Sequence, residues 1–196
     1  MSAAPRRKFT EEEYLATERG ADFRSEYHDG EIFAMAGATY PHNRVKDNLA
    51  RHIGNQLAGT PCFPLTSDMK VKVTKTRRYL YPDILVICGQ PLFPNAETTD
   101  VILNPIMVVE VLSPSTELYD RKTKLKHYTK IETLKEVVLL SQYEPLVERY
   151  VLHASGDWVW IETSGLESEL IFDAIAVRVP LRQIYEGVDL ELSDPG

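Results

Sequence analysis

Cysteine is scarce in this sequence, and long apolar runs are missing. The 196 residues include two cysteines, Cys62 and Cys88. Two thiols are too few for a disulfide framework or a tetrahedral zinc site, and we expect a reducing, cytoplasmic compartment. No stretch approaches 18 consecutive apolar residues, so we expect no transmembrane helix and no membrane partner. The first residues are basic without a following apolar stretch, so we expect no secretory signal.

The remaining composition is that of a globular protein. Hydrophobic residues make up 43% of the chain and charged residues 26%, both close to the average for globular domains. The length suits one core, so we expect a single domain over residues 1–196. The order of elements is helix, hairpin, helix, three strands, helix and further strands. This order predicts an α/β domain with a mixed sheet, of the α+β type, with an added antiparallel hairpin.

Local signals place these elements along the chain. A capping box at Thr10 opens the first helix, Asp29-Gly30 is a hairpin turn, and Pro41 starts the second helix. The buried stripe of that helix is expected to comprise Val45, Leu49, Ile53 and Leu57. The other expected elements are an extended segment at 62–73, strands at 81–87, 106–112 and 136–141, a helix over 115–131 with Leu118, Leu125 and Tyr128 on one side, an antiparallel pair at 146–152 and 157–163, and a short amphipathic segment near 181–185.

The charge is unevenly distributed. The net charge is −7, but residues 42–78 hold eight basic and two acidic side chains, and residues 120–130 hold five basic and one acidic. Between these two basic islands, residues 79–119 contain five acidic side chains and no lysine or arginine. Such islands are commonly solvated faces. They would also attract a polyanion, because local potential rather than the chain average steers association.

Two carboxylates lie within strands that are otherwise apolar. Asp83 is part of the 81–87 segment and Glu110 part of the 106–112 segment. A buried ionised carboxylate is costly unless it is paired or binds a metal. If the two strands are neighbours, both groups can converge on one point and hold Mg²⁺ or Mn²⁺ with water filling the other positions. The alternative is a pair of structural acids satisfied by protein donors.

Other candidate residues lie before and after this pair. Asp120 and Lys124 are spaced i, i+4 and share a helix face, so the lysine could bend over the strand ends or form an ordinary surface ion pair. Glu26 precedes the hairpin turn. His42 lies on the inward face of the second helix and is either an accessory group of the site or a core histidine.

These residues together resemble the Uma family of restriction endonucleases, a branch of the PD-(D/E)xK nuclease superfamily. The specific motif is the run from Glu110 to Thr116, Glu-Val-Leu-Ser-Pro-Ser-Thr, and the resemblance covers about residues 9–188. Supporting motifs are Glu26-Tyr27-His28-Asp29-Gly30-Glu31, Met35-Ala36-Gly37, His42-Asn43, Tyr81-Pro82-Asp83, Asn104-Pro105 and Tyr119-Asp120-Arg121 with Lys124 and Tyr128.

The resemblance implies a restriction-endonuclease-like core with flanking helices and a Mg²⁺-dependent (or Mn²⁺-dependent) endonuclease acting on DNA. Asp83 and Glu110 match the motif acids that hold the metal, and the Val111 carbonyl is a further expected ligand. The superfamily lysine normally follows the glutamate by two residues, where this chain has Leu112. Lys124 matches a lysine displaced onto the next helix, and Glu26 matches an accessory glutamate, with Asp120 and His42 in support.

The resemblance also leads us to expect that DNA backbone contacts come from the basic islands, namely Lys70, Lys72, Arg77, Arg78, Arg121 and Lys122. Cutting both strands would need a homodimer or two successive nicks. Two alternatives stay open. One is a non-catalytic nucleic-acid- or protein-binding module that retains the fold. The other is a metal-dependent hydrolase of small phosphoesters.

Overall fold

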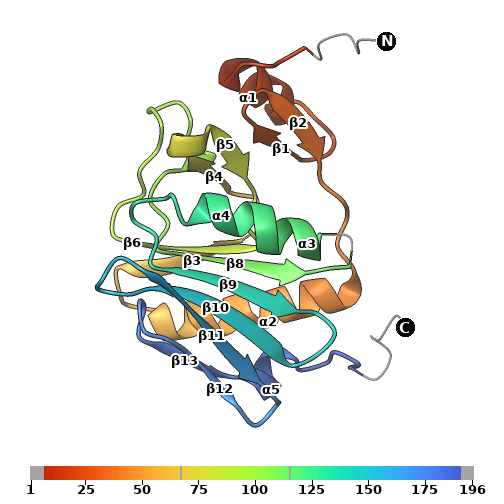
Figure 1. The fold of residues 1–196 in the computed structure, drawn as a ribbon, viewed down its shortest axis with the longest axis vertical. Coiled ribbons are helices and arrows are strands. Elements are labelled where there is room, and N and C mark those ends of the chain that lie inside the picture. The colour runs from red at the N-terminus through yellow and green to blue at the C-terminus, as the bar shows by residue number, and fades with distance from the viewer. Residues whose placement is uncertain (1–6, 67, 115, 191–196) are drawn as a thin grey trace.

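The computed structural model describes residues 7–66, 68–114 and 116–190, and its strands form two main sheets (Figure 1). The larger sheet has six strands in the order β11-β10-β9-β8-β6-β3. Its strands are β3 (Cys62–Thr66), β6 (Ile84–Cys88), β8 (Met107–Leu112), β9 (Glu136–Ser141), β10 (Leu146–Leu152) and β11 (Trp158–Ser164). β8 and β9 are parallel, and the other neighbours are antiparallel, so the sheet is mixed.

The second sheet has five strands in the order β2-β1-β5-β4-β7. They are β1 (Ser25–His28), β2 (Glu31–Ala34), β4 (Lys70–Val73), β5 (Arg78–Leu80) and β7 (Val101–Ile102). A separate hairpin pairs β12 (Glu169–Phe172) with β13 (Val177–Pro180). Residues 81–83 connect β5 to β6 and therefore lie where the two main sheets meet.

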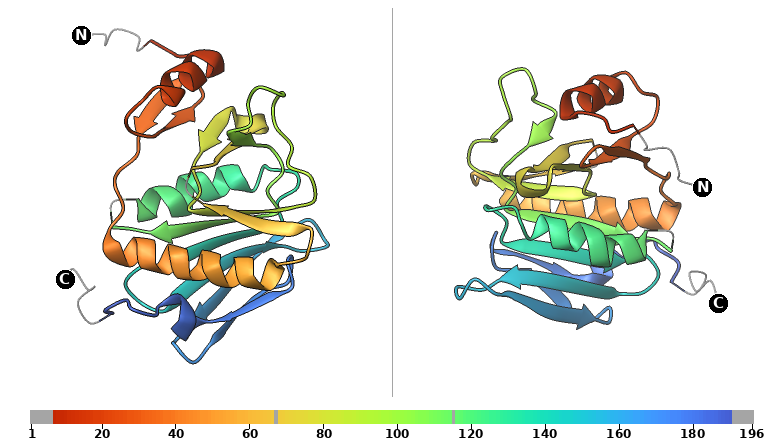
Figure 2. Two further views of the ribbon diagram at one scale, coloured as in Figure 1. Left: turned by 180° about the vertical axis from the view of Figure 1, so that it is seen from behind. Right: turned by 45° about the horizontal axis from the view of Figure 1, so that its top comes forward.

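The helical elements are α1 (Glu11–Arg19), α2 (Tyr40–Leu57), the 3₁₀ turn η1 (Thr74–Thr76), α3 (Glu117–Tyr119), the π-helical turn η2 (Asp120–Lys124), α4 (Leu125–Tyr128) and α5 (Leu181–Ile184). The long helix α2 and the α3–α4 segment lie on opposite faces of the six-stranded sheet (Figures 1 and 2). α1 and the β1–β2 hairpin stand at one end of the molecule, above the α3–α4 segment in Figure 1.

Alternating side chains of the central strands supply two cores. On one face, Ile84, Val86 and Val109 pack with the buried stripe of α2 and with the β12–β13 hairpin. On the other face, Leu85 and Val108 pack with β4, β5 and Tyr128 of α4. Strands buried on both sides explain why these segments are almost continuously apolar in the sequence.

The structure confirms the local signals near the N-terminus. Thr10 and Glu13 form both hydrogen bonds of a capping box at the start of α1. Asp29 and Gly30 both adopt positive φ in the turn between β1 and β2. The predicted stripe of α2 is buried at all four positions.

Two expected elements are interrupted. The extended segment at 62–73 splits into β3 and β4, which belong to different sheets. The helix expected over 115–131 contains a π turn, in which the Leu125 N–H donates to the Asp120 carbonyl, and Ser115 lies outside the described residues. The extra residue in this turn rotates the preceding helix face. The predicted position of Leu118 on the buried side is therefore wrong, since it is 66% exposed.

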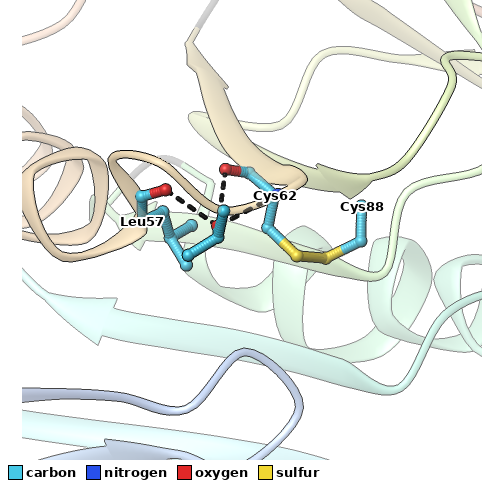
Figure 3. The surroundings of a disulfide bond; sticks show 4 residues. Leu57, Cys62 and Cys88 are labelled. Atoms are coloured by element: carbon cyan, nitrogen blue, oxygen red, sulfur yellow. Dashed lines mark hydrogen bonds between the residues drawn. A yellow bond between two sulfur atoms is a disulfide. The ribbon is translucent and has the colours of Figure 1, made fainter.

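No bond between the two cysteines was predicted. Cys62 and Cys88 are register partners at the ends of β3 and β6 and form a disulfide (Figure 3). Thr60 supports this corner by donating to the Leu57 carbonyl at the end of α2. Among the helices of the described residues, none combines the length and apolar character needed to cross a membrane.

Candidate active site

The expected position of Asp83 inside a strand is wrong, because β6 begins one residue later, at Ile84. The register of the six-stranded sheet still brings Asp83 to Glu110. Ile84 of β6 lies opposite Val109 of the antiparallel strand β8. Asp83, one residue before Ile84, and Glu110, one residue after Val109, are therefore opposed. The Val111 backbone N–H donates to Asp83 Oδ2 at 2.8 Å. The expectation that these two strands are neighbours is confirmed.

Lys124 reaches this pair from the π turn. Its Nζ lies 3.1 Å from Glu110 Oε1 and 3.4 Å from Asp120 Oδ1. The lysine is only 7% exposed. Leu112, which occupies the usual lysine position of the superfamily, is instead buried in the core below α4. The ammonium thus comes from the helix and not from the strand.

Glu26 reaches the same point from β1 of the five-stranded sheet. Its Oε1 lies 3.3 Å from Lys124 Nζ and accepts the Tyr81 backbone N–H at 3.1 Å. The Tyr119 hydroxyl donates to Glu26 Oε2 at 3.0 Å. Both main sheets and the segment after β8 therefore contribute to one cluster.

Two further side chains contact Asp83 and Glu110. His42 Nε2, in the first turn of α2, lies 3.2 Å from Asp83 Oδ2. The Tyr128 hydroxyl donates to Glu110 Oε1 at 2.6 Å. The predicted position of His42 beside the acids agrees with this geometry.

A pocket of about 740 Å³ contains the cluster. Among the residues that line it are all the predicted acids, His42, Val111 and Lys124. The opposite wall is formed by the end of β2 and by residues 35–39, which connect β2 to α2. This volume lies within the range of pockets that enclose a small ligand.

Burial and the surplus of carboxylates perturb the titration of the cluster. Burial raises the pKa of Glu110 well above its usual range, with the negative charges of Asp120 and Asp83 adding to the effect and Lys124 opposing it. Burial would also raise the pKa of Glu26, but Lys124, His28 and the Tyr81 N–H lower it to about 2. Burial lowers the pKa of Lys124, but its carboxylate neighbours outweigh this and raise it well above the usual value.

The donor set fits a hard divalent cation. Glu26, Glu110 and Asp120 share one buried ammonium, and Asp83 lies opposite Glu110, so carboxylates outnumber the ammonium in the cluster. Carboxylate oxygens are the ligands that Mg²⁺ prefers, and Mg²⁺ commonly keeps several waters beside one or two carboxylates. Within the described ranges, no three His, Cys, Asp or Glu side chains form a group that could hold a metal ion. A water-rich site on Asp83 and Glu110 fits these residues, and a complete protein cage does not.

The six basic residues expected to contact DNA lie outside this pocket. Several are already paired with carboxylates. Lys70 contacts Asp100 at 2.8 Å, Lys72 contacts Glu11 at 2.5 Å, and Arg121 pairs with Glu148. Arg77 lies 3.2 Å from Asp29, Arg78 is partly buried, and Lys122 is exposed. Their contact with DNA stays a prediction. Arg24 and Lys46 are the arginine and lysine that, with Lys124, line the pocket.

No role in the site was predicted for His28, Tyr119 or Tyr128. The Tyr119 hydroxyl lies 2.7 Å from His28 Nε2, and the His28 and Tyr119 rings stack. A signal for His28 was available, because it is two residues after Glu26 and points to the same face of a strand. Tyr128 packs in the same core as Leu125, on the side predicted for it, but its hydrogen bond to Glu110 was not predicted. Tyr119 could not be placed from sequence because the π turn changes which helix residues share a face.

Comparisons with known proteins show the family and the fold of this chain. The Uma2 family, described as "Putative restriction endonuclease", matches residues 11–181. Two uncharacterised Synechocystis proteins, slr1290 and sll1609, are 33% and 32% identical to this chain. The matches cover 95% and 90% of this chain, and 96% and 99% of the relatives.

A solved structure shares the fold. It is described as a "putative nuclease belonging to DUF820" from Anabaena variabilis, with a TM-score of 0.74 and 14% identity. The similarity covers 89% of this chain and 96% of that one. At this identity it shows the fold alone, which is the mixed, restriction-endonuclease-like architecture expected from the sequence. The family match and the relatives together show that the chain belongs to the Uma2 family.

Proposed function

We propose that this protein is a Mg²⁺-dependent endonuclease that hydrolyses phosphodiester bonds of DNA at the Asp83–Glu110 pair. The main support is the position of Lys124, whose Nζ lies 3.1 Å from Glu110 although it comes from the following helix. The buried ammonium of Lys124 and the opposed carboxylates of Asp83 and Glu110 supply the acid–acid–lysine set of a PD-(D/E)xK site. The family match over residues 11–181 supports a nuclease-like activity.

Each residue of the cluster has a distinct part in the proposed reaction. Asp83, Glu110 and the Val111 carbonyl would hold the cation, which when bound lowers the pKa of a water and polarises the phosphate. Lys124 orients the attacking water and offsets the charge that develops on the phosphoryl oxygens. Glu26 and Asp120 hold the Lys124 ammonium in place, and His42 holds Asp83. Tyr128 fixes Glu110.

The test is metal-dependent nicking of supercoiled plasmid. We expect nicking with Mg²⁺ or Mn²⁺, its loss with EDTA, and a drop of at least roughly 100-fold in Asp83→Ala, the usual scale for losing a preorganised charged group. Calorimetric Mn²⁺ binding should weaken in the same variant. Asp157→Ala, at the exposed turn between β10 and β11, is the matched control and should behave as wild type.

Other outcomes would identify the alternatives. Mn²⁺ binding without cleavage of DNA would contradict the proposal and indicate a binding module that retains the fold. Cleavage of a small model phosphodiester, but not of plasmid, would indicate a small-phosphoester hydrolase. We also propose DNA as the partner and a homodimer as the form that cuts both strands. Sedimentation of the full chain measures whether it is a dimer.

A further inference from the structure

Three aromatic rings, those of Phe33, His28 and Tyr119, lie beside the candidate carboxylate Glu26. In the β1–β2 hairpin, Phe33 is the register partner of Glu26. The Phe33 ring packs on His28, with 4.6 Å between ring centroids. His28 in turn stacks with Tyr119 at 5.7 Å and 14° between the ring planes. Three rings therefore follow one another from the carboxylate cluster to the pocket surface.

The outer ring of this group is open to solvent. Phe33 is 46% exposed although it lines the pocket, whereas His28 behind it is buried. Two more exposed apolar side chains adjoin pocket-lining residues: Tyr40 follows Thr39, and Leu118 precedes Tyr119. Covering the exposed Phe33 ring with an apolar or aromatic group would remove apolar surface from water, which favours binding of such a group at the pocket.

The site below these rings is enclosed from two sides. Residues 35–39 descend from β2 to α2 and pass the α3 end of the α3–α4 segment in both ribbon views (Figures 1 and 2). Tyr119 of α3 contacts Glu26 and His28 of β1 across the pocket. The pocket of about 740 Å³ around Asp83 and Glu110 is large enough for a phosphate together with its attached nucleoside.

We propose that Phe33, backed by His28, is a stacking platform for an unpaired nucleobase next to the scissile phosphate, so that the site takes single-stranded or locally unpaired nucleic acid. This inference rests on the proposed function and specifies its substrate. Bases in an intact duplex are already stacked on both faces and offer no free ring. An aromatic platform therefore favours unstacked bases, and it does so without reading sequence.

The test measures binding separately from cleavage. The full chain is titrated in Ca²⁺ and in EDTA against a fluorescent single-stranded oligonucleotide and the duplex of the same sequence, and anisotropy gives both affinities. We expect the single strand to bind at least 10-fold more tightly. Phe33→Ala should weaken single-strand binding by roughly 5- to 100-fold, as expected for the loss of one stacked base, and leave duplex binding unchanged.

Three controls keep the test independent of folding and of catalysis. Phe33→Trp should retain single-strand affinity, and Trp160→Ala, which removes a 53% exposed aromatic residue from β11, should behave as wild type. The third control uses a single strand that carries the fluorescent base 2-aminopurine. Its fluorescence should be quenched by stacking when it binds the wild type, but not when it binds Phe33→Ala. Equal affinity for both forms, or equal weakening of both by Phe33→Ala, overturns the inference even if plasmid nicking succeeds. Selective binding of the single strand, without Mg²⁺-dependent cleavage of either the single strand or the plasmid, overturns the proposed function alone.

Discussion

At the scale of single residues, Lys124 balances three carboxylates with one charge. Its ammonium lies within 3.1–3.4 Å of Glu110, Glu26 and Asp120, in surroundings where the effective dielectric constant is low. Removing the ammonium would therefore have two opposite effects. It would abolish charge stabilisation of the phosphoryl group, and it would leave the acids more attractive to a cation.

We expect Lys124→Met to lose cleavage by about 100- to 1,000-fold while binding Mn²⁺ at least as tightly as wild type. Nicking assays and Mn²⁺ calorimetry measure the two effects. Lys135→Met is the control, because this exposed lysine lies directly before β9, outside the two basic islands, and should alter neither quantity. A parallel loss of metal binding and cleavage would mean that Lys124 has only a structural role.

Sequence reasoning located the individual acids better than their partners. Asp83 and Glu110 stand out because a charge inside an apolar strand needs a reason, and strand alternation gives their common face. Glu26 was a candidate from its place before the hairpin turn and from the resemblance, but no local pattern shows that β1 of a second sheet would come within reach. The supporting hydroxyls of Tyr119 and Tyr128 depend on the π turn, which has no clear sequence signature.

At the scale of elements, strand β3 is held at the edge of the six-stranded sheet by β6 on one side. Its five residues pair with the strand that begins directly after Asp83. The capping box and turn signals of α1 and the β1–β2 hairpin could be predicted because they depend on neighbouring residues. The disulfide could not, because it depends on a cross-strand register between residues that are 26 positions apart.

We expect the Cys62–Cys88 bond to stabilise the fold by about 3 kcal/mol, since it closes a loop of this length in the unfolded chain. Reductant should lower the Tm by roughly 6 to 12 °C for a domain of this size. Calorimetry or circular dichroism with and without reductant gives the shift. The Cys62→Ala/Cys88→Ala double variant should melt at the lower temperature in both buffers, and an unchanged wild-type Tm would contradict the prediction.

At the scale of the whole molecule, a buried arginine joins the six-stranded sheet to the β12–β13 hairpin. Arg149 of β10 lies 3.0 Å from Glu136 of β9 and also donates to the Ile171 carbonyl of β12. Burial raises the pKa of Glu136 to about 7, with Asp173 adding to the shift and Arg149 opposing it. The hairpin itself was missed in the sequence, because its short strands pair only with each other.

The raised pKa of Glu136 makes global stability depend on pH. Below about pH 4.5 the carboxyl is protonated in both the folded and the unfolded chain, and its stabilising contribution is fully present. Between about pH 4.5 and 7 the unfolded chain loses the proton while the folded chain retains it, so the free energy of unfolding falls as pH rises. Above about pH 7 the contribution is lost and this dependence ends.

We therefore expect Glu136→Gln to remove about 3 kcal/mol of the decrease in unfolding free energy between pH 4.5 and 7.5, since each pKa unit corresponds to about 1.4 kcal/mol. Urea denaturation at several pH values in this range gives the slope of unfolding free energy against pH. Slopes can be compared even if the variant is less stable at every pH. Glu162→Gln, on the exposed edge strand β11, should keep the wild-type slope. Identical slopes for wild type and Glu136→Gln would show that Arg149 keeps Glu136 ionised, and that the ion pair binds the hairpin to the sheet at every pH in this range.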